Sequence, residues 1–189
     1  MKSDKYYIER ILGGDVNAYS YLVDAYKGLV YTVALRMLKN EEDAEELAQD
    51  TFVKAFGSLN DFKFESKFST WLYRITYNGA ISRLRKKRVQ TFDVDDVTLP
   101  ESEVVSTYSA INELKKEEQK RFINEAINNL KEDDAFIITL YYLKENSVEE
   151  ISEITGFNFS NVKVKLHRAR KRFYEELKLI LKDEVKAIL

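Results

Sequence analysis

Residues that break helices are scarce in this chain, and this scarcity constrains the fold more than any other feature of the sequence. The 189 residues include one proline, Pro100, and six glycines. Proline removes a backbone donor and glycine weakens a helix, so long stretches without either residue favour helices. Through most of the chain, apolar residues recur at three- and four-residue spacing, which is typical of amphipathic helices. The sequence therefore predicts an all-α protein of one ordinary domain or two small ones.

The residue types present exclude several classes of site. The chain has no cysteine and a single histidine, His167. Disulfides, thiolate zinc sites, cysteine nucleophiles and multi-histidine metal sites are therefore excluded. With no nucleophile–base pair and no phosphate-cradling glycine loop, we expect no catalytic residue, no metal and no cofactor. No apolar run approaches the ~18–20 residues of a membrane span, and Met1–Arg10 lacks a signal-peptide core, so we expect a soluble, cytoplasmic protein.

Residues 1–90 are predicted to form one compact domain of four helices. The first two cover about 5–12 and 15–38, with Gly13-Gly14 between them and Asp15 expected to cap the second. Asn40 is expected to cap the third helix and Gly57 to end it. The fourth covers about 69–88, follows an aromatic stretch, and finishes in five basic residues: Arg83, Arg85, Lys86, Lys87 and Arg88.

Charge divides the chain into three segments. Residues 1–92 carry a net charge of +3, residues 93–134 carry −7, and residues 135–189 carry +2, which together give the overall −2. Around Pro100 the sequence loses its helical periodicity and is acidic. We interpret residues 91–107 as a flexible acidic linker, so the predicted organisation is 1–90, linker 91–107 and 108–189. Its acids are Asp93, Asp95, Asp96, Glu101 and Glu103.

The second predicted domain, 108–189, ends in a helix-turn-helix at residues 147–173. Helices are expected from near residue 108, at about 132–143, at 147–155, and from about 160 into the 180s. On the last helix, an apolar stripe spaced i, i+4, i+7 and i+11 must face the core: Val162, Leu166, Ala169 and Phe173. Lys163, Val164 and His167 then point outward near the helix start, where such a helix reaches base edges. The residues suited to phosphates are Lys165, Arg168, Lys171 and Arg172.

The fourth predicted helix combines aromatic and basic side chains. Aromatic faces stack unpaired bases and basic groups hold phosphates, so a protein that opens a duplex needs both types close together. Only part of the aromatic set has to be exposed for this role. The candidates for this second DNA surface are Phe64, Trp71, Tyr73, Asn78, Arg83, Arg85 and Lys86. The acids that open the third helix suit its dipole, or form a face for protein docking.

Three strings together resemble one known family. Residues 43–52, DAEELAQDTF, resemble region 2.2 of the extracytoplasmic-function (ECF) sigma factors of RNA polymerase. FSTWLYRI at 68–75, with Asn78, is similar to their regions 2.3 and 2.4. VEEISEITG at 148–156, followed by VKVKLHRAR at 162–170, is similar to their region 4.2. The order and spacing match over about residues 8–178. The lack of room for a third domain near 91–108 points to the minimal two-domain type.

The resemblance implies a function and its residues. Such a protein binds core RNA polymerase, recognises the −35 and −10 promoter elements and promotes strand opening, with no reaction of its own. By resemblance, the helix at 43–52 docks on the clamp helices of the beta-prime subunit, through Asp43, Glu46, Gln49, Asp50 and Phe52. Asn78 matches the position that meets a −10 base, and the helix-turn-helix reads the −35 element. Part of the second domain sits on the beta flap, the acidic linker threads through the polymerase, and an anti-sigma partner is expected.

Two other functions remain open on the residues alone. A conventional helix-turn-helix regulator explains residues 147–173 but leaves the strings at 43–52 and 71–78 without a role. A helical adaptor that binds only proteins predicts no salt-dependent contact with DNA. A regulator shifts duplex DNA by itself, whereas a sigma factor of this type binds it poorly without polymerase.

Overall fold

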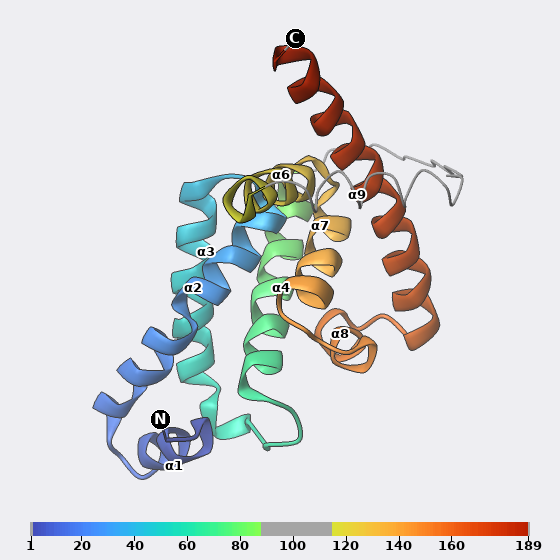
Figure 1. Ribbon diagram of the computed structural model, residues 1–189. Helices are drawn as coiled ribbons and strands as arrows, with labels where there is room; N and C mark the ends of the chain where they lie inside the picture. Colours follow the sequence, from blue (N-terminus) through green and yellow to red (C-terminus); the bar gives the residue numbers. More distant parts are fainter. Residues whose placement is uncertain (1, 88–114, 189) are drawn as a thin grey trace. The chain divides into compact units, whose positions relative to one another are not determined.

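The computed structural model describes residues 2–87 and 115–188, and all regular structure in these ranges is helical (Figure 1). The prediction of an all-α fold is confirmed for them. By internal contacts the described chain forms two units: α1 to α4 together with Glu149–Phe157, and α6, α7, η3 and α9. The predicted linker 91–107, the helix start near residue 108 and Arg88 lie outside the described residues, so the domain boundaries stay a prediction.

The first unit is built on three helices that pack against one another, α2 (Tyr19–Leu38), α3 (Glu41–Gly57) and α4 (Phe68–Lys87). Figure 1 shows them side by side, and α1 (Asp4–Leu12) packs against α2. The short turns η1 (Val16–Ala18) and η2 (Leu59–Asp61) complete the unit. Its core is formed by fully buried apolar residues from every one of these elements, among them Ile8, Ala18, Leu22, Val30, Ala55, Leu59 and Leu72.

Of the two helix caps predicted in this unit, the one at Asn40 is confirmed and the one at Asp15 is wrong. The Asn40 side chain accepts a 2.9 Å hydrogen bond from the Asp43 N–H and caps α3, as the sequence predicted. Asp15 does not cap α2, because its carboxylate pairs with Arg10 instead. A short 3₁₀ turn follows Asp15, and α2 begins only at Tyr19. The ion pair and the cap would use the same carboxylate, and in this structure the carboxylate forms the ion pair.

The second unit packs α6 (Lys116–Asn129) and α7 (Glu132–Ile138) against α9 (Phe159–Ile188). Its core cluster contains Phe122, Ala126, Leu177 and Ile180. The helix predicted at 132–143 continues past α7 as one widened turn, η3 (Thr139–Leu143), closed by a 3.1 Å bond from the Lys144 N–H to the Thr139 carbonyl. An ion pair between the partly exposed Arg172 and the buried Asp134 links α9 to α7.

The turn before α9 is held by local hydrogen bonds. After α8 (Val148–Thr155), the Gly156 N–H bonds to the Ser152 carbonyl at 2.9 Å, and Gly156 has φ +74°. Glycine adopts this left-handed conformation without the strain that a Cβ would bring. The Asn158 side chain then accepts a 2.8 Å bond from the Asn161 N–H and caps α9. The sequence predicted both the glycine break and the start of the last helix to within a residue.

Candidate functional site

The outer face of α3 carries most of the residues predicted to dock on polymerase. The face turned to the core is buried at Ala44, Leu47, Thr51 and Ala55, so the residues between them face solvent. Glu46, Gln49 and Asp50 are exposed, and Asp43 is partly exposed. Phe52 differs from the others because only 9% of it is exposed, and its carbonyl accepts a 2.7 Å hydrogen bond from the Tyr19 hydroxyl. Burial raises the pKa of Tyr19 to about 12.

Two apolar residues of α3 that the docking prediction omitted lie on the surface. Val53 is 74% exposed and Phe56 is 39% exposed. Both fall outside the apolar stripe of this helix, so the spacing already placed them on another face. A large exposed apolar side chain beside carboxylates is typical of a protein interface. On α3 the exposed large apolar side chains are thus Val53 and Phe56, whereas Phe52, which was predicted to dock, is buried.

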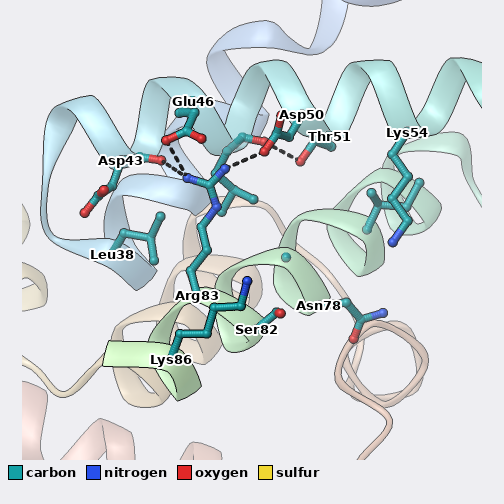
Figure 2. A pocket seen from close by; sticks show the side chains of 13 residues that line it. Leu38, Asp43, Glu46, Asp50, Thr51, Lys54, Asn78, Ser82, Arg83 and Lys86 are labelled. Carbon is teal, nitrogen blue, oxygen red and sulfur yellow. Dashed lines mark hydrogen bonds and ion pairs between the residues drawn. The ribbon is translucent and has the colours of Figure 1, made fainter. Parts of the chain in front are cut away.

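A groove of about 580 Å³ lies between α3 and α4, and Arg83 crosses it (Figure 2). The guanidinium reaches from α4 to α3, where it pairs with Asp50 and, at 3.2 Å, with Glu46. It also donates a 3.3 Å hydrogen bond to the main-chain carbonyl of Asp43. The sequence assigned Arg83 to DNA and these acids to polymerase, and the structure brings the two sets together in one contact.

The remaining residues of the predicted −10 surface differ in exposure. Phe64 is 42% exposed, and its φ of +59° is a strained conformation for a bulky residue. Asn78, Arg85 and Lys86 are exposed on α4, and Figure 2 shows Asn78 and Lys86 beside the groove. Trp71 is partly buried, with its ring 5.2 Å from that of Phe62.

Tyr73, which was assigned to the same surface, is 2% exposed, and burial raises its pKa. Together with the half-buried Trp71, it shows that the inner face of α4 is used for packing. The structure thus leaves Phe64 as the exposed aromatic residue of the three that were predicted to meet DNA.

On α9 the predicted division into inner and outer faces is confirmed by burial. Val162, Leu166 and Ala169 are buried, and Phe173 packs on the core cluster of the second unit. The predicted base-reading and phosphate residues lie off this stripe. The exposed ones are Lys163, Val164, His167 and Arg168, and the partly exposed ones are Lys165, Lys171 and Arg172.

Several basic side chains of α9 have partners within the second unit or on the helix itself: Arg172 pairs with Asp134, and Lys163 and Lys165 each make a contact as well. The Lys163 ammonium lies 4.3 Å from the ring centroid of Phe159, a cation–π contact one turn away. The Lys165 ammonium lies 3.5 Å from the Asp133 carboxylate on α7. Phe159 is 40% exposed and was not among the predicted residues. Its position at the start of the last helix, one turn before Lys163, could have marked it as a residue of this surface.

The described residues were also compared with the requirements of a membrane-spanning helix and of a metal site. No helix within them is long and apolar enough to cross a membrane. They contain no group of three or more acidic or histidine side chains that could hold a metal ion.

Comparison with known proteins identifies the class of both units. The Sigma-70 region 2 model matches residues 22–89, and the Sigma-70 region 4 model matches residues 121–173. The chain is 33% identical to the ECF RNA polymerase sigma factor SigW of Bacillus subtilis, over 90% of this chain and 95% of that protein. It is 30% identical to the ECF RNA polymerase sigma-E factor of Haemophilus influenzae, over 95% and 97% of the two chains.

Solved structures agree in fold. CnrH, solved in complex with the cytosolic domain of CnrY, covers 94% of this chain at 21% identity with a TM-score of 0.62. The sigma factor RpoE of Bartonella quintana, solved in complex with the anti-sigma factor NepR, covers 85% at 22% identity with the same score. This chain belongs to the ECF RNA polymerase sigma factors. It is a transcription initiation factor and not an enzyme.

Proposed function

We propose that this sigma factor binds core RNA polymerase through α3 and directs it to promoters through α4 and α9. The observation that carries the proposal is the outer face of α3, where Glu46, Gln49 and Asp50 are exposed in line with Val53 and Phe56. Carboxylates beside exposed apolar side chains suit a docking surface whose partner is basic and apolar in turn. The clamp helices of the beta-prime subunit are the proposed partner.

We propose that the exposed end of α4 meets the −10 element and helps to open it. Asn78 is exposed at the position where the family meets a −10 base, and Phe64 offers an exposed ring for stacking an unpaired base. Arg85 and Lys86, exposed at the end of the helix, are the proposed phosphate contacts. On the same helix Trp71 is partly buried and Tyr73 is buried.

The −35 element is the proposed target of the first turns of α9. Lys163, Val164 and His167 are exposed together near its start, which is the end of a recognition helix that contacts base edges. Lysine pairs with guanine acceptors, and the valine methyls suit the thymine methyl. Arg168 and Lys171 would hold the adjoining phosphates, with Lys165 alongside them.

Three further parts of the proposal concern partners. Part of the second unit would sit on the beta flap, and the acids of the linker would occupy basic surface inside the polymerase. An anti-sigma factor would hold the protein inactive, which is supported by the solved complex of the similar sigma factor RpoE with the anti-sigma factor NepR. Action on polymerase would place the protein in the cytoplasm.

The test is transcription with purified bacterial core polymerase on fragmented genomic DNA, followed by sequencing of transcript 5′ ends. We expect new start sites that share two upstream motifs, and these motifs define the promoter. A variant with Gln49→Ala and Asp50→Ala should lose them through weaker core binding while keeping its helix content. The absence of new starts together with no binding to core would contradict the proposal, and a shift of duplex DNA by the protein alone would favour a conventional regulator.

A further inference from the structure

The Arg83 side chain is held on α3 by three contacts. Its guanidinium pairs with Asp50 and with Glu46, and it donates to the main-chain carbonyl of Asp43 (Figure 2). These acceptors are spaced three, four and seven residues apart, so they lie on one stripe of α3. A guanidinium has five donors in a planar fork and can serve several acceptors at once, which a lysine ammonium on its flexible stem does less well.

The packing of the two helices brings Arg83 into reach. Gly79 lies one helical turn before Arg83 on α4, and a Cβ at Gly79 would lie 2.6 Å from the Cδ1 atom of Leu47. Leu47 itself is buried, one residue after Glu46 on α3. The missing side chain at Gly79 thus allows the close approach of α3 and α4 beside the contact that Arg83 makes.

Arg83 also offsets a concentration of negative charge. Residues 41–53 of α3 contain six acids and no basic residue, and Lys54 follows them. Like charges three and four residues apart repel each other on a helix. Arg83 is only 23% exposed at its side chain, whereas Glu46 and Asp50 remain 67% and 63% exposed. Each carboxylate therefore keeps solvent-facing surface while one side of it is fixed by the guanidinium.

We infer that Arg83 is a positioning residue for the polymerase-docking surface and not a contact to promoter phosphates. It holds Glu46 and Asp50 in one orientation before the partner arrives, which lowers the entropy lost on docking. The inference rests on the proposed function, because it assumes that α3 is the surface that meets polymerase. It moves Arg83 out of the basic run that meets DNA and leaves Arg85 and Lys86 there.

The experiment compares Arg83→Met with Arg85→Met, a control on the same helix that removes an exposed charge. Core affinity is measured by titrating labelled protein with core polymerase, and open-complex formation is measured with core saturated. For Arg83→Met we expect core affinity to fall about three- to tenfold, with open-complex formation by the saturated enzyme unchanged. For Arg85→Met we expect wild-type core affinity, weaker open-complex formation and a shallower salt dependence.

A double-mutant cycle separates positioning from a general loss of stability. If Arg83 acts through Asp50, then Arg83→Met adds little further loss of core affinity to Asp50→Asn. A structural role alone would instead lower the unfolding midpoint, and the two losses would add. Arg83→Lys retains the charge, should bind core with intermediate affinity, and provides a folded variant should Arg83→Met fail to fold.

The outcomes are distinct. Wild-type core affinity for Arg83→Met, with the same DNA defect as Arg85→Met, would overturn the inference and return Arg83 to the phosphate contacts. Additive losses in the cycle would overturn it as well. Failure of the wild-type protein to bind core would instead contradict the proposed function itself, and the wild-type titration shows this first.

Discussion

The two helices proposed to meet DNA, α4 in the first unit and α9 in the second, bury different shares of their surfaces. α4 packs against both α2 and α3, so residues on more than one side of it are buried, among them Leu72, Tyr73 and Tyr77. The first turns of α9 bury a single narrow stripe through Val162 and Leu166. The residue type therefore predicts exposure differently on the two helices. In the first turns of α9 a basic or aromatic residue is at least partly exposed unless it lies on the stripe, whereas on α4 an aromatic residue can be buried on either side of the helix.

The largest effect should come from a buried aromatic residue of α4. Tyr73→Ala removes a ring that is 2% exposed, and we expect the free energy of unfolding of the first unit to fall by about 3–5 kcal/mol. Tyr73→Phe keeps the ring and should leave stability nearly unchanged. Urea unfolding followed by circular dichroism measures both. A stable Tyr73→Ala protein that forms no open complex would mean that this ring acts on DNA, and the contrast with α9 would fail.

The difference in packing between α4 and α9 also explains which exposed residues could be predicted from the sequence. The stripe at Val162, Leu166 and Ala169 was read correctly because one-sided packing gives a clean i, i+4, i+7 spacing. In the fourth helix no such spacing separates the buried Tyr73 from exposed residues, since α4 has neighbours on two sides, and Phe64 lies in the segment before that helix. The pairing of Arg83 with α3 was not predictable, because it joins residues 33 and 37 positions apart that only the packing brings together.

Family resemblance supplied what spacing could not. The assignment of residues 43–52 to polymerase came from the resemblance, whereas the residues alone left an acidic face with two explanations. Phe52 belonged to that string, and it is buried with its carbonyl bonded to Tyr19. A sequence motif identifies a segment of the chain, but only the exposed side chains of that segment can contact a partner.

A second prediction compares two adjacent acids of α7. Asp134 is a buried residue paired with Arg172 of α9, whereas the Asp133 side chain is 40% exposed and lies 3.5 Å from Lys165. Asp134→Ala leaves a partly buried guanidinium without its partner, so we expect a loss of about 1.5–3 kcal/mol of stability. Asp133→Ala should cost less than about 1 kcal/mol. Equal losses in thermal unfolding would show that burial does not separate the two pairs.

A third prediction tests the exposed face of α9. Lys163→Ala should change discrimination at one −35 position by about tenfold, since one good base contact contributes about 1–3 kcal/mol. Lys165→Ala should weaken binding to all sequences alike, and by less, because Lys165 is shared with Asp133. Transcription by the reconstituted enzyme from a library of randomised −35 elements measures both. A uniform loss for Lys163→Ala would place that residue on phosphate.

The smallest expected effect concerns the hydrogen bond between Tyr19 of α2 and the Phe52 carbonyl of α3. Tyr19→Phe removes this 2.7 Å bond, and we expect it to cost about 0.5–1.5 kcal/mol near neutral pH. Burial raises the pKa of Tyr19 from 10.0 to about 12. A raised pKa for a phenol means that the unfolded chain ionises first, so the stabilisation is complete below pH 10 and is lost as the pH rises toward 12.

The pH dependence of the stability loss in Tyr19→Phe therefore tests the hydrogen bond more sharply than the magnitude of that loss. The stability difference between wild type and Tyr19→Phe should shrink steadily as the pH rises from about 10 to about 12, the range between the ordinary and raised pKa of Tyr19. Urea unfolding of both proteins at matched pH measures it, and Tyr21→Phe, at a residue 56% exposed, is the matched control. A constant difference across this range would mean that the Tyr19 hydroxyl is solvated and that α2 and α3 are not joined by it.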